Sequence, residues 1–314
     1  MIHTFTVLLS ITALSATTHA RHFSPQSTNR LHQLRAGGSS SLYERNPNYQ
    51  QVAPVTLGDV DNNGYYHPSV TYGIPSSNRR PPPITSLIRD YFTSLHNFSP
   101  TLSYGTYASL FLFVLWQFPT TRIKKLLQEH FVCSRRNIRQ RRYHSLLTSA
   151  FSHASLHHLA VNLYAFLTFG PSVKQILASQ DIPLGIFVLS AALFGSWAFL
   201  AFDSTGMGSC IGLSGVTLAL LAFDSLIYPS KELRMIVSFI PIHLPAYYLF
   251  LGLMGFSLMG VLGLLGGTSN VAHSTHLGGL LFGNCFYEAF RRGWIRRWNY
   301  QLKSAYYKLN RSSY

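Results

Sequence analysis

From residue 101 onward the chain carries six apolar stretches that contain very few charged side chains. They cover roughly residues 101–118, 153–170, 183–202, 211–228, 244–266 and 271–290. A helix that spans a membrane needs about 20 mainly apolar residues, and these stretches approach or reach that length. The pattern therefore predicts an all-α membrane protein, a bundle of six transmembrane helices within residues 101–292. The first two stretches fit least well, and the second contains His153, His157, His158 and Asn162.

The charge of the chain favours a lipid surface as its partner. Only 11% of the residues are charged, against about 25% in a typical soluble domain. The net charge of +15 would also suit nucleic acid. However, the basic residues flank apolar segments and do not alternate with aromatic residues on a polar surface. We therefore expect anionic membrane lipids as partners and no nucleic acid.

Two basic regions border the predicted bundle. The segment 119–150 holds eight basic residues: Arg122, Lys124, Lys125, Arg135, Arg136, Arg139, Arg141 and Arg142. The tail 293–314 is also basic, and its Trp294 and Trp298 lie four residues apart. This spacing predicts a helix that lies on the membrane surface. With six spans the two regions fall on opposite sides, so they indicate no orientation.

The first hundred residues have the composition of a targeting segment followed by a linker. Residues 1–20 hold a short apolar run that resembles the core of a signal sequence. No acidic residue occurs before Glu44, while arginines lie among Ser, Gln and Thr, as in transit peptides. Residues 21–100 also hold nine of the fifteen prolines, which predicts a low-complexity linker. We expect an organelle address, mitochondrion or plastid; a secretory signal is the alternative.

Three polar clusters interrupt the apolar stretches, and polar groups at such positions are costly and usually functional. The first contains His158 and Asn162, which are four residues apart and so share one helix face. The second runs from Gly206 to Gly215, and the third contains His273 and His276. The cysteines Cys133, Cys210 and Cys285 are far apart in sequence and read as free thiols.

The second cluster contains the motif Gly212-x-Ser214-Gly215. A serine at a glycine-rich turn before a helix exposes its hydroxyl beside the amides of the helix start. Such amides can stabilise the oxyanion of an acyl-transfer reaction. The alternative is a serine that merely eases helix packing. A nucleophilic serine also needs a base, and the histidines of the other two clusters are the candidates within the apolar stretches.

Small residues suggest how the serine and a histidine could meet. Gly279 and Gly283 form a Gly-x-x-x-Gly face one turn after His276. Gly215 and Ala219 form a similar face directly after Ser214. Docking of two such faces would bring Ser214 and His276 to the same depth. The alternative for His276 is a side chain that binds a neighbouring backbone carbonyl.

These motifs together resemble the rhomboid family over about residues 143–290. The resemblance rests on His158-x-x-x-Asn162, Gly212-x-Ser214-Gly215 and Ala272-His273-x-x-His276-Leu277-Gly278-Gly279-x-x-x-Gly283, and the segment 146–153 fits as well. The pair His273 and His276 is similar to the mitochondrial, presenilin-associated rhomboid-like branch. The family's Trp-Arg pair in the first loop is absent, which leaves the anchoring of that loop in doubt. The extra leading span of the mitochondrial branch is not evident either.

The resemblance implies a six-helix intramembrane serine endopeptidase that cleaves transmembrane or membrane-associated proteins. Ser214 would then be the nucleophile, and His276 would act as general base and then as acid. His158 and Asn162, with the Ser214 amide, would form the oxyanion hole. The glycines Gly212, Gly215, Gly279 and Gly283 would support the helix packing. Asp224 is ten residues beyond Ser214, too deep to orient His276, and reads as a carboxylate that snorkels near a helix end.

Two other classes of function compete with this hypothesis. His153 and His157 are four apart and could hold zinc on one helix face, but the zinc-protease motif His-Glu-x-x-His is absent. Haem ligation from two helices is possible, yet it leaves Gly-x-Ser-Gly unexplained. We therefore expect no metal and no cofactor. The second alternative is a catalytically inactive rhomboid-like protein that binds or chaperones membrane proteins.

Overall fold

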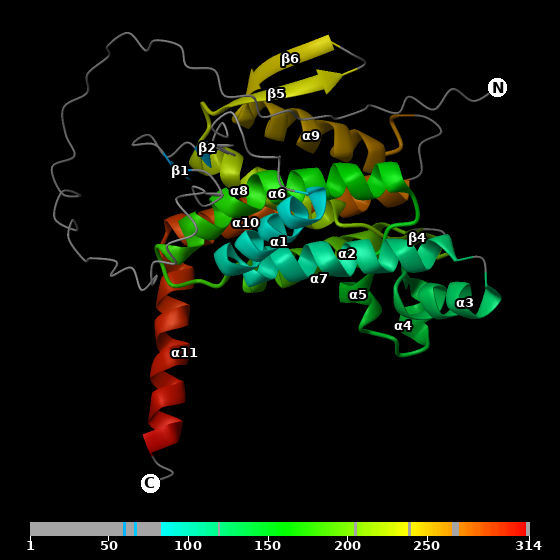
Figure 1. The fold of residues 1–314 in the computed structure, drawn as a ribbon, viewed down its shortest axis with the longest axis horizontal. Helices are drawn as coiled ribbons and strands as arrows, with labels where there is room; N and C mark the ends of the chain where they lie inside the picture. The colour runs from blue at the N-terminus through cyan, green and yellow to red at the C-terminus, as the bar shows by residue number, and fades with distance from the viewer. Residues whose placement is uncertain are drawn as a thin grey trace, which may run out of the picture.

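The computed structural model describes residues 59–60, 66–67, 83–118, 120–203, 206–237, 240–265 and 270–311. The predicted targeting segment 1–20 and most of the predicted linker 21–100 lie outside these described residues. Within the described part the chain is a bundle of helices joined by short strands and loops (Figure 1). The prediction of an all-α architecture is confirmed.

Each of the six apolar stretches forms one helix. These helices are α2 (Pro100–Gln117), α6 (Leu156–Ala178), α7 (Leu184–Phe202), α8 (Ser214–Ile227), α9 (Ala246–Val261) and α10 (Asn270–Arg291). By length and composition, α7 is the single described helix that could cross a membrane on its own, and α8 and α9 are shorter apolar helices. The existence of the six helices therefore follows the sequence pattern, whereas the six spans stay a prediction.

Further elements lie outside these six helices. They are α1 (Ile84–Phe98), α3 (Thr121–His130), α4 (Arg135–Arg139), α5 (Ser145–Thr148), the 3-10 helix η1 (Ser149–Phe151) and α11 (Trp294–Arg311). The strands are β1 (Asp59–Val60), β2 (Tyr66–His67), β3 (Cys133–Ser134), β4 (Ser209–Cys210), β5 (Glu232–Val237) and β6 (Ile240–Pro245). They pair antiparallel as β1 with β2, β3 with β4 and β5 with β6.

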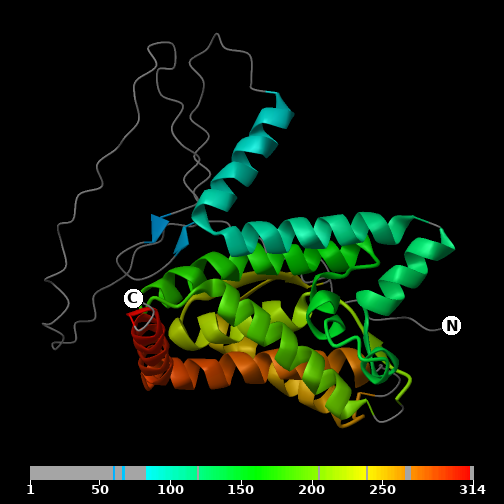
Figure 2. The same ribbon diagram turned by 90° about the horizontal axis from the view of Figure 1, so that it is seen from below.

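The prediction of a linker over residues 21–100 was wrong for Ile84–Phe98. This segment is α1, which leans away from α2 at one edge of the bundle (Figure 2). Its Leu95 is buried in the core, while Ile84, Leu87 and Ile88 are exposed. The three consecutive prolines end where the helix begins, because proline is tolerated at a helix start but not in its interior. Pro83 is the residue that precedes its first turn.

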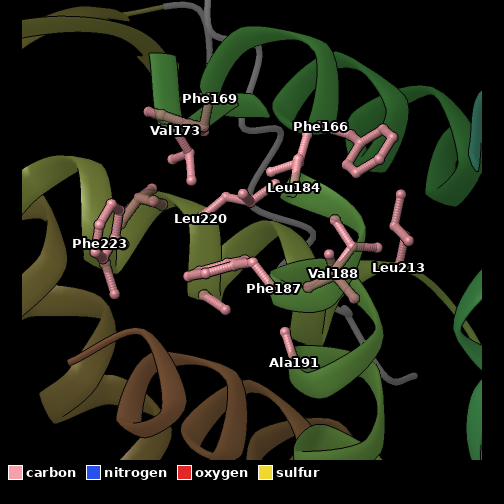
Figure 3. Packing of buried hydrophobic residues seen from close by; sticks show 14 of the residues in the cluster. Phe166, Phe169, Val173, Leu184, Phe187, Val188, Ala191, Leu213, Leu220 and Phe223 are labelled. Carbon is pink, nitrogen blue, oxygen red and sulfur yellow. The ribbon is translucent and has the colours of Figure 1, made fainter. Parts of the chain in front are cut away.

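Helix α8 is the centre of the bundle. It contacts α6, α7, α9 and α10, and every residue from Gly215 to Ser225 except Leu218 is buried. The core between α6, α7 and α8 includes Phe187 and Phe223 (Figure 3), whose rings meet edge to face at 5.6 Å between centroids. A helix that is apolar on nearly all sides lies either in a protein core or in a membrane. The sequence of α8 is therefore compatible with the central position that it occupies.

The packing of α8 against α10 depends on glycine. A Cβ atom at Gly279 would lie 3.0 Å from the Cα atom of Gly215 and would overlap the Gly215 carbonyl group. A Cβ atom at Gly283 would lie 2.8 Å from the Cβ atom of Ala222 and would overlap the carbonyl oxygen of Ala219. The two backbones are thus in direct contact, which only glycine on α10 allows.

Asp224 does not snorkel to the membrane surface, which corrects the sequence-based interpretation. Its side chain is fully buried within α8. It accepts hydrogen bonds from Ser172 of α6 and from Lys231, whose Nζ lies 2.9 Å from Oδ2. The Lys231 side chain is itself only 14% exposed. A buried carboxylate requires such partners, because an unpaired buried charge costs several kcal/mol.

We predict that Gly279→Val lowers the thermal stability of the protein. The added side chain must push the backbone of α10 away from Gly215, and overpacking of this kind costs about 1–3 kcal/mol. The melting temperature should fall by about 5 °C or more. The matched control is Gly252→Val on α9, where an added Cβ meets no atom within 4 Å. Equal melting temperatures for the two variants would show that the α8–α10 contact is not a tight one.

Candidate active site

Ser214 occupies the first position of α8, directly after a tight turn. Gly212 has a φ of +114°, a conformation that side chains other than glycine rarely adopt. Leu213 then precedes the helix and provides no side-chain cap. The first amides of a helix have no partner within that helix. Ser214, which is half-buried, therefore lies beside backbone donors suited to an oxyanion.

Gly212 is also required by its neighbour His158 on α6. A Cβ atom at Gly212 would lie 2.7 Å from Nε2 of His158 and would overlap the ring. The imidazole of His158 therefore packs directly on the peptide backbone two residues before Ser214. His158 is half-buried at this place.

His153 is hydrogen-bonded to the same turn, a role that the sequence analysis did not predict. The amide of Leu213 donates a hydrogen bond to Nε2 of His153 at 3.2 Å. Nδ1 of the same ring lies 3.3 Å from the carbonyl oxygen of Phe151 and can donate to it. The two contacts together require a neutral ring with its proton on Nδ1. His153 is fully buried, and Gly212 donates a further bond to the carbonyl of Ser149.

The structure separates His153 from His157, the pair whose spacing could have held zinc. Helix α6 begins at Leu156, with Ser155 as its cap. His153 therefore precedes the helix and is buried, while His157 is exposed. The serine cap was the signal that could have separated the two residues. Within the described ranges, no group of three or more His, Cys, Asp or Glu side chains is arranged to hold a metal ion.

Asn162 lies on α6, one turn after His158, and is 4% exposed. Its Nδ2 donates to the carbonyl oxygen of His158 at 2.9 Å. Its Oδ1 accepts a hydrogen bond from Oγ1 of Thr217 at 3.5 Å. Thr217 is on the first turn of α8, and its single hydroxyl proton is shared with the carbonyl oxygen of Ser214, which lies 3.1 Å from Oγ1. Asn162 thus bridges α6 and α8 at the turn that carries Ser214.

His276 approaches the same end of α8 from α10. The residue before it, Thr275, packs on Gly215, whose added Cβ would lie 3.2 Å from the Thr275 methyl group. One turn later, Gly279 contacts Gly215 as well. His276 is half-buried and lies within electrostatic range of His158. The fold therefore gathers Ser214, His158, Asn162 and His276 at one end of the bundle.

His273 belongs to a different contact. Its ring packs on Gly260 of α9, where an added Cβ would overlap the imidazole. It also meets the ring of Phe256 edge to face at 5.2 Å between centroids. His273 is buried and joins α10 to α9, whereas the Thr275 side of α10 faces α8.

A small cavity, mainly apolar but lined also by serine and threonine residues, lies behind the serine turn. It has a volume of about 10 Å³, enough for about one water molecule. Its walls come from η1, α7, the turn before α8, and α10. The residues that line it are Ser149, Ala150, Ala192, Ser196, Cys210, Ile211, Gly212, Gly215, Val216 and Thr275. Water can therefore be held next to the turn despite the apolar surroundings.

The segment between α2 and α6 is anchored without a Trp-Arg pair. Arg135 of α4 donates hydrogen bonds to the carbonyl oxygens of Leu200, at 2.6 Å, and Asp203, at 3.1 Å. Asn137 donates to two further carbonyls, of Gln128 and Val132, each at 2.8 Å. This segment is thereby fixed to the end of α7, and β3 pairs with β4 just before the serine turn.

Comparison with known proteins places these features in one family. The model of the rhomboid domain matches residues 140–292. RHOMBOID-like protein 12, mitochondrial, from Arabidopsis thaliana is 29% identical over 201 residues, covering 59% of this chain and 56% of the relative. The human presenilin-associated rhomboid-like protein, mitochondrial, is 25% identical over 207 residues, covering 62% and 50%. Rhomboid protein 1, mitochondrial, from Saccharomyces cerevisiae is 27% identical over 175 residues, covering 55% and 48%.

The chain thus spans about half the length of the curated relatives that it matches. The matched region includes the serine turn of α8, the His158 and Asn162 pair of α6 and the His276 segment of α10. On these grounds, residues 140–292 of the chain form a rhomboid domain.

Proposed function

We propose that this protein is an intramembrane serine endopeptidase that cleaves transmembrane or membrane-associated proteins with a dyad of Ser214 and His276. The observation that carries the proposal is the backbone contact of α8 with α10. Gly215, next to Ser214, lies against Thr275, next to His276, and against Gly279 one turn further. Two groups that act as nucleophile and base must be held this close by rigid elements.

The proposed reaction has two stages. Ser214 Oγ attacks the carbonyl carbon of the substrate while His276 accepts the hydroxyl proton. His276 then gives this proton to the leaving amine, and an acyl-enzyme forms. In the second stage His276 accepts a proton from water as the water oxygen attacks the acyl carbon. His276 then gives this proton to Ser214 Oγ as the bond between the acyl carbon and Oγ breaks, which releases the acid product and restores both groups. The cavity behind the turn, lined in part by Ser149, Ser196 and Thr275, is a suitable place for that water.

The oxyanion hole in this proposal consists of the Ser214 amide, His158 and Asn162. Gly212 and His153 support it, because the first lets His158 approach the turn and the second holds the Leu213 amide. Gly215, Gly279 and Gly283 support the dyad through helix packing. Preorganised donors of this kind stabilise the negative charge only as it develops in the transition state.

The membrane placement is part of the same proposal. Helices α2, α6, α7, α8, α9 and α10 would be the six spans. Helix α11 is basic and has exposed Trp294 and Trp298, which suits a helix that lies on anionic lipid. The relatives are named as mitochondrial, and we place the chain in a mitochondrial membrane as a multi-pass protein.

The first test of the function is mutation of the dyad. Ser214→Ala and His276→Ala should each abolish cleavage of a transmembrane substrate in liposomes. The double variant should be no worse, because the two groups act as a unit. Ser209→Ala and His157→Ala are matched controls, since both side chains are exposed. Residual cleavage above a few per cent in Ser214→Ala would remove Ser214 from the mechanism. Failure of a serine-reactive phosphonate to label the folded wild-type protein would favour an inactive binding protein.

A second test separates the catalytic and structural roles of Asn162. If Asn162 donates to the oxyanion, the Asn162→Ala substitution should lower kcat by roughly 100- to 1,000-fold with little change in KM. If Asn162 only bridges the two helices, the Asn162→Ala substitution should lower the free energy of unfolding by about 0.6–2 kcal/mol and leave turnover per folded molecule near normal.

Thr217→Val is the informative partner of this variant. It removes the hydroxyl that binds Asn162 Oδ1 but keeps the Asn162 amide as a donor. We expect Thr217→Val to turn over at nearly the wild-type rate. A kcat within twofold of wild type for Asn162→Ala, measured on the folded fraction, would place Asn162 outside the active site.

The targeting prediction concerns the acid-free start of the chain. Residues 1–43, fused to a fluorescent protein, should direct it to mitochondria and be cleaved there. The control is the same fusion with Arg21, Arg30 and Arg35 changed to Glu, which should stay in the cytosol. Fluorescence confined to the secretory route or to plastids would contradict the mitochondrial placement.

A further inference from the structure

Two cysteines face each other directly in front of the serine turn. Cys133 of β3 and Cys210 of β4 are partners in the antiparallel register. Partners in such a ladder have Cα atoms about 4.5–5.5 Å apart, within the range of about 4.4–6.8 Å that a disulfide requires. The two thiol groups also share a hydrogen bond. A disulfide could therefore form with little movement of the backbone.

The pair joins two parts of the chain that matter to the site. Cys133 is fully buried and lies just before Arg135, which anchors its segment to the end of α7. Cys210 is half-buried and lies four residues before Ser214. Its thiol also contacts the hydroxyl of Thr275, the residue next to His276. Cys210 thus contacts the residue next to His276 on α10 and lies on the chain segment that leads into α8.

We propose that Cys133 and Cys210 form a site of reversible oxidation, in which a small hydroperoxide converts the two thiols into a disulfide that clamps the turn before Ser214. Only the effect on catalysis rests on the proposed function; the modification itself does not. The third cysteine, Cys285, is exposed on α10 and offers an internal comparison within the same chain.

The chemistry balances with hydrogen peroxide as the oxidant. The thiolate of one cysteine attacks a peroxide oxygen, the O–O bond breaks, and a sulfenic acid and hydroxide form. The sulfur of the second cysteine attacks the sulfenic sulfur, and the S–S bond forms as water leaves. In total two thiols and one peroxide give one disulfide and two water molecules, with two electrons passing from sulfur to oxygen. An added thiol reverses the change by exchange.

The surroundings of Cys133 and Cys210 determine how fast the two thiols are oxidised. The hydrogen bond with Cys133, together with burial, raises the pKa of Cys210 well above its usual range. A raised pKa leaves less thiolate at neutral pH, so oxidation is slow there and becomes faster as the pH rises. The site would then respond to sustained oxidant and not to brief pulses.

The disulfide should change the active-site end of α8. Drawing the Cys210 sulfur onto Cys133 moves it from Thr275 and pulls on the turn that includes Gly212 and Leu213. Displacement of a catalytic group by about 1 Å can lower a rate by about 100-fold. We expect labelling of Ser214 by a phosphonate to slow by roughly tenfold or more in the oxidised protein, and to recover after reduction.

The experiment uses the full chain in liposomes with Cys285→Ser as the background. The protein is treated with hydrogen peroxide at pH 7 and pH 9, free thiols are alkylated, and peptides are identified by mass spectrometry. A peptide pair linked through Cys133 and Cys210, formed faster at pH 9 and lost on reduction, is the expected result. The melting temperature should rise by about 5 °C or more on oxidation. Cys133→Ala and Cys210→Ala are the controls, and neither should show this rise.

Each outcome bears on the proposal. Full alkylation of both thiols after peroxide, or conversion to sulfinic acid without a linked peptide, would overturn it. A linked peptide together with unchanged phosphonate labelling of Ser214 would contradict the proposed effect of the disulfide on the turn before Ser214. Absence of phosphonate labelling in the reduced protein is instead a failure of the proposed function, since the linked peptide and the melting temperature report on the disulfide without any activity.

Discussion

The contact between the backbones of α8 and α10 is the constraint on which the other features of the site depend. At Gly279 the two helices are so close that a methyl group would displace one of them. In a contact of this kind the two backbones touch directly, without long side chains between them. Long side chains have many rotamers, so they would define the axial position of one helix relative to the other less precisely. Since Ser214 and His276 are each one residue from this contact surface, their relative position is determined by main chain and not by loops. Loop motions would then have little effect on the distance between Ser214 and His276.

Much of the fold could be predicted because the apolar stretches of a membrane protein are long and free of charge. Each stretch became a helix, and the small residues of α8 and α10 indicated which faces could meet. What could not be predicted depends on tertiary contacts. Helix α1 packs on the core through the buried Leu95, although the sequence of α1 directly follows a proline-rich segment. The hairpin of β5 and β6 between α8 and α9 was not predicted either, because most of it lies between the two apolar stretches that end at residue 228 and begin at residue 244.

The candidate site shows the same division between local pattern and tertiary contact. The sequence pattern indicated Ser214, His158, Asn162 and His276 as groups of one site, and their spacing along single helices was visible. The supporting role of His153 was not predicted, because it depends on the amide of Leu213, some sixty residues later. Asp224 was predicted to lie near a helix end as a snorkelling carboxylate for a similar reason. No pattern in the sequence indicates that Ser172 and Lys231 are its partners. Partners that are distant in sequence leave no periodic signal, so only the folded arrangement identifies them.

The buried pair of Asp224 and Lys231 bears on how the protein enters its membrane. Helix α8 has 14 residues, about 21 Å in length, which is shorter than the hydrocarbon core of about 30 Å. A carboxylate adds about 2.5–3.5 kcal/mol to the cost of inserting a segment alone when it lies at the helix centre, and less when it lies near an end, as Asp224 does. Lys231 follows only seven residues later, so the two charges can enter together as a neutral pair, but Ser172 must already be in place on α6 to complete the hydrogen bonds. This favours a biogenesis in which α6 and α7 enter the membrane first and α8 then packs directly against them. Helix α8 would in that case never need to be stable in lipid by itself.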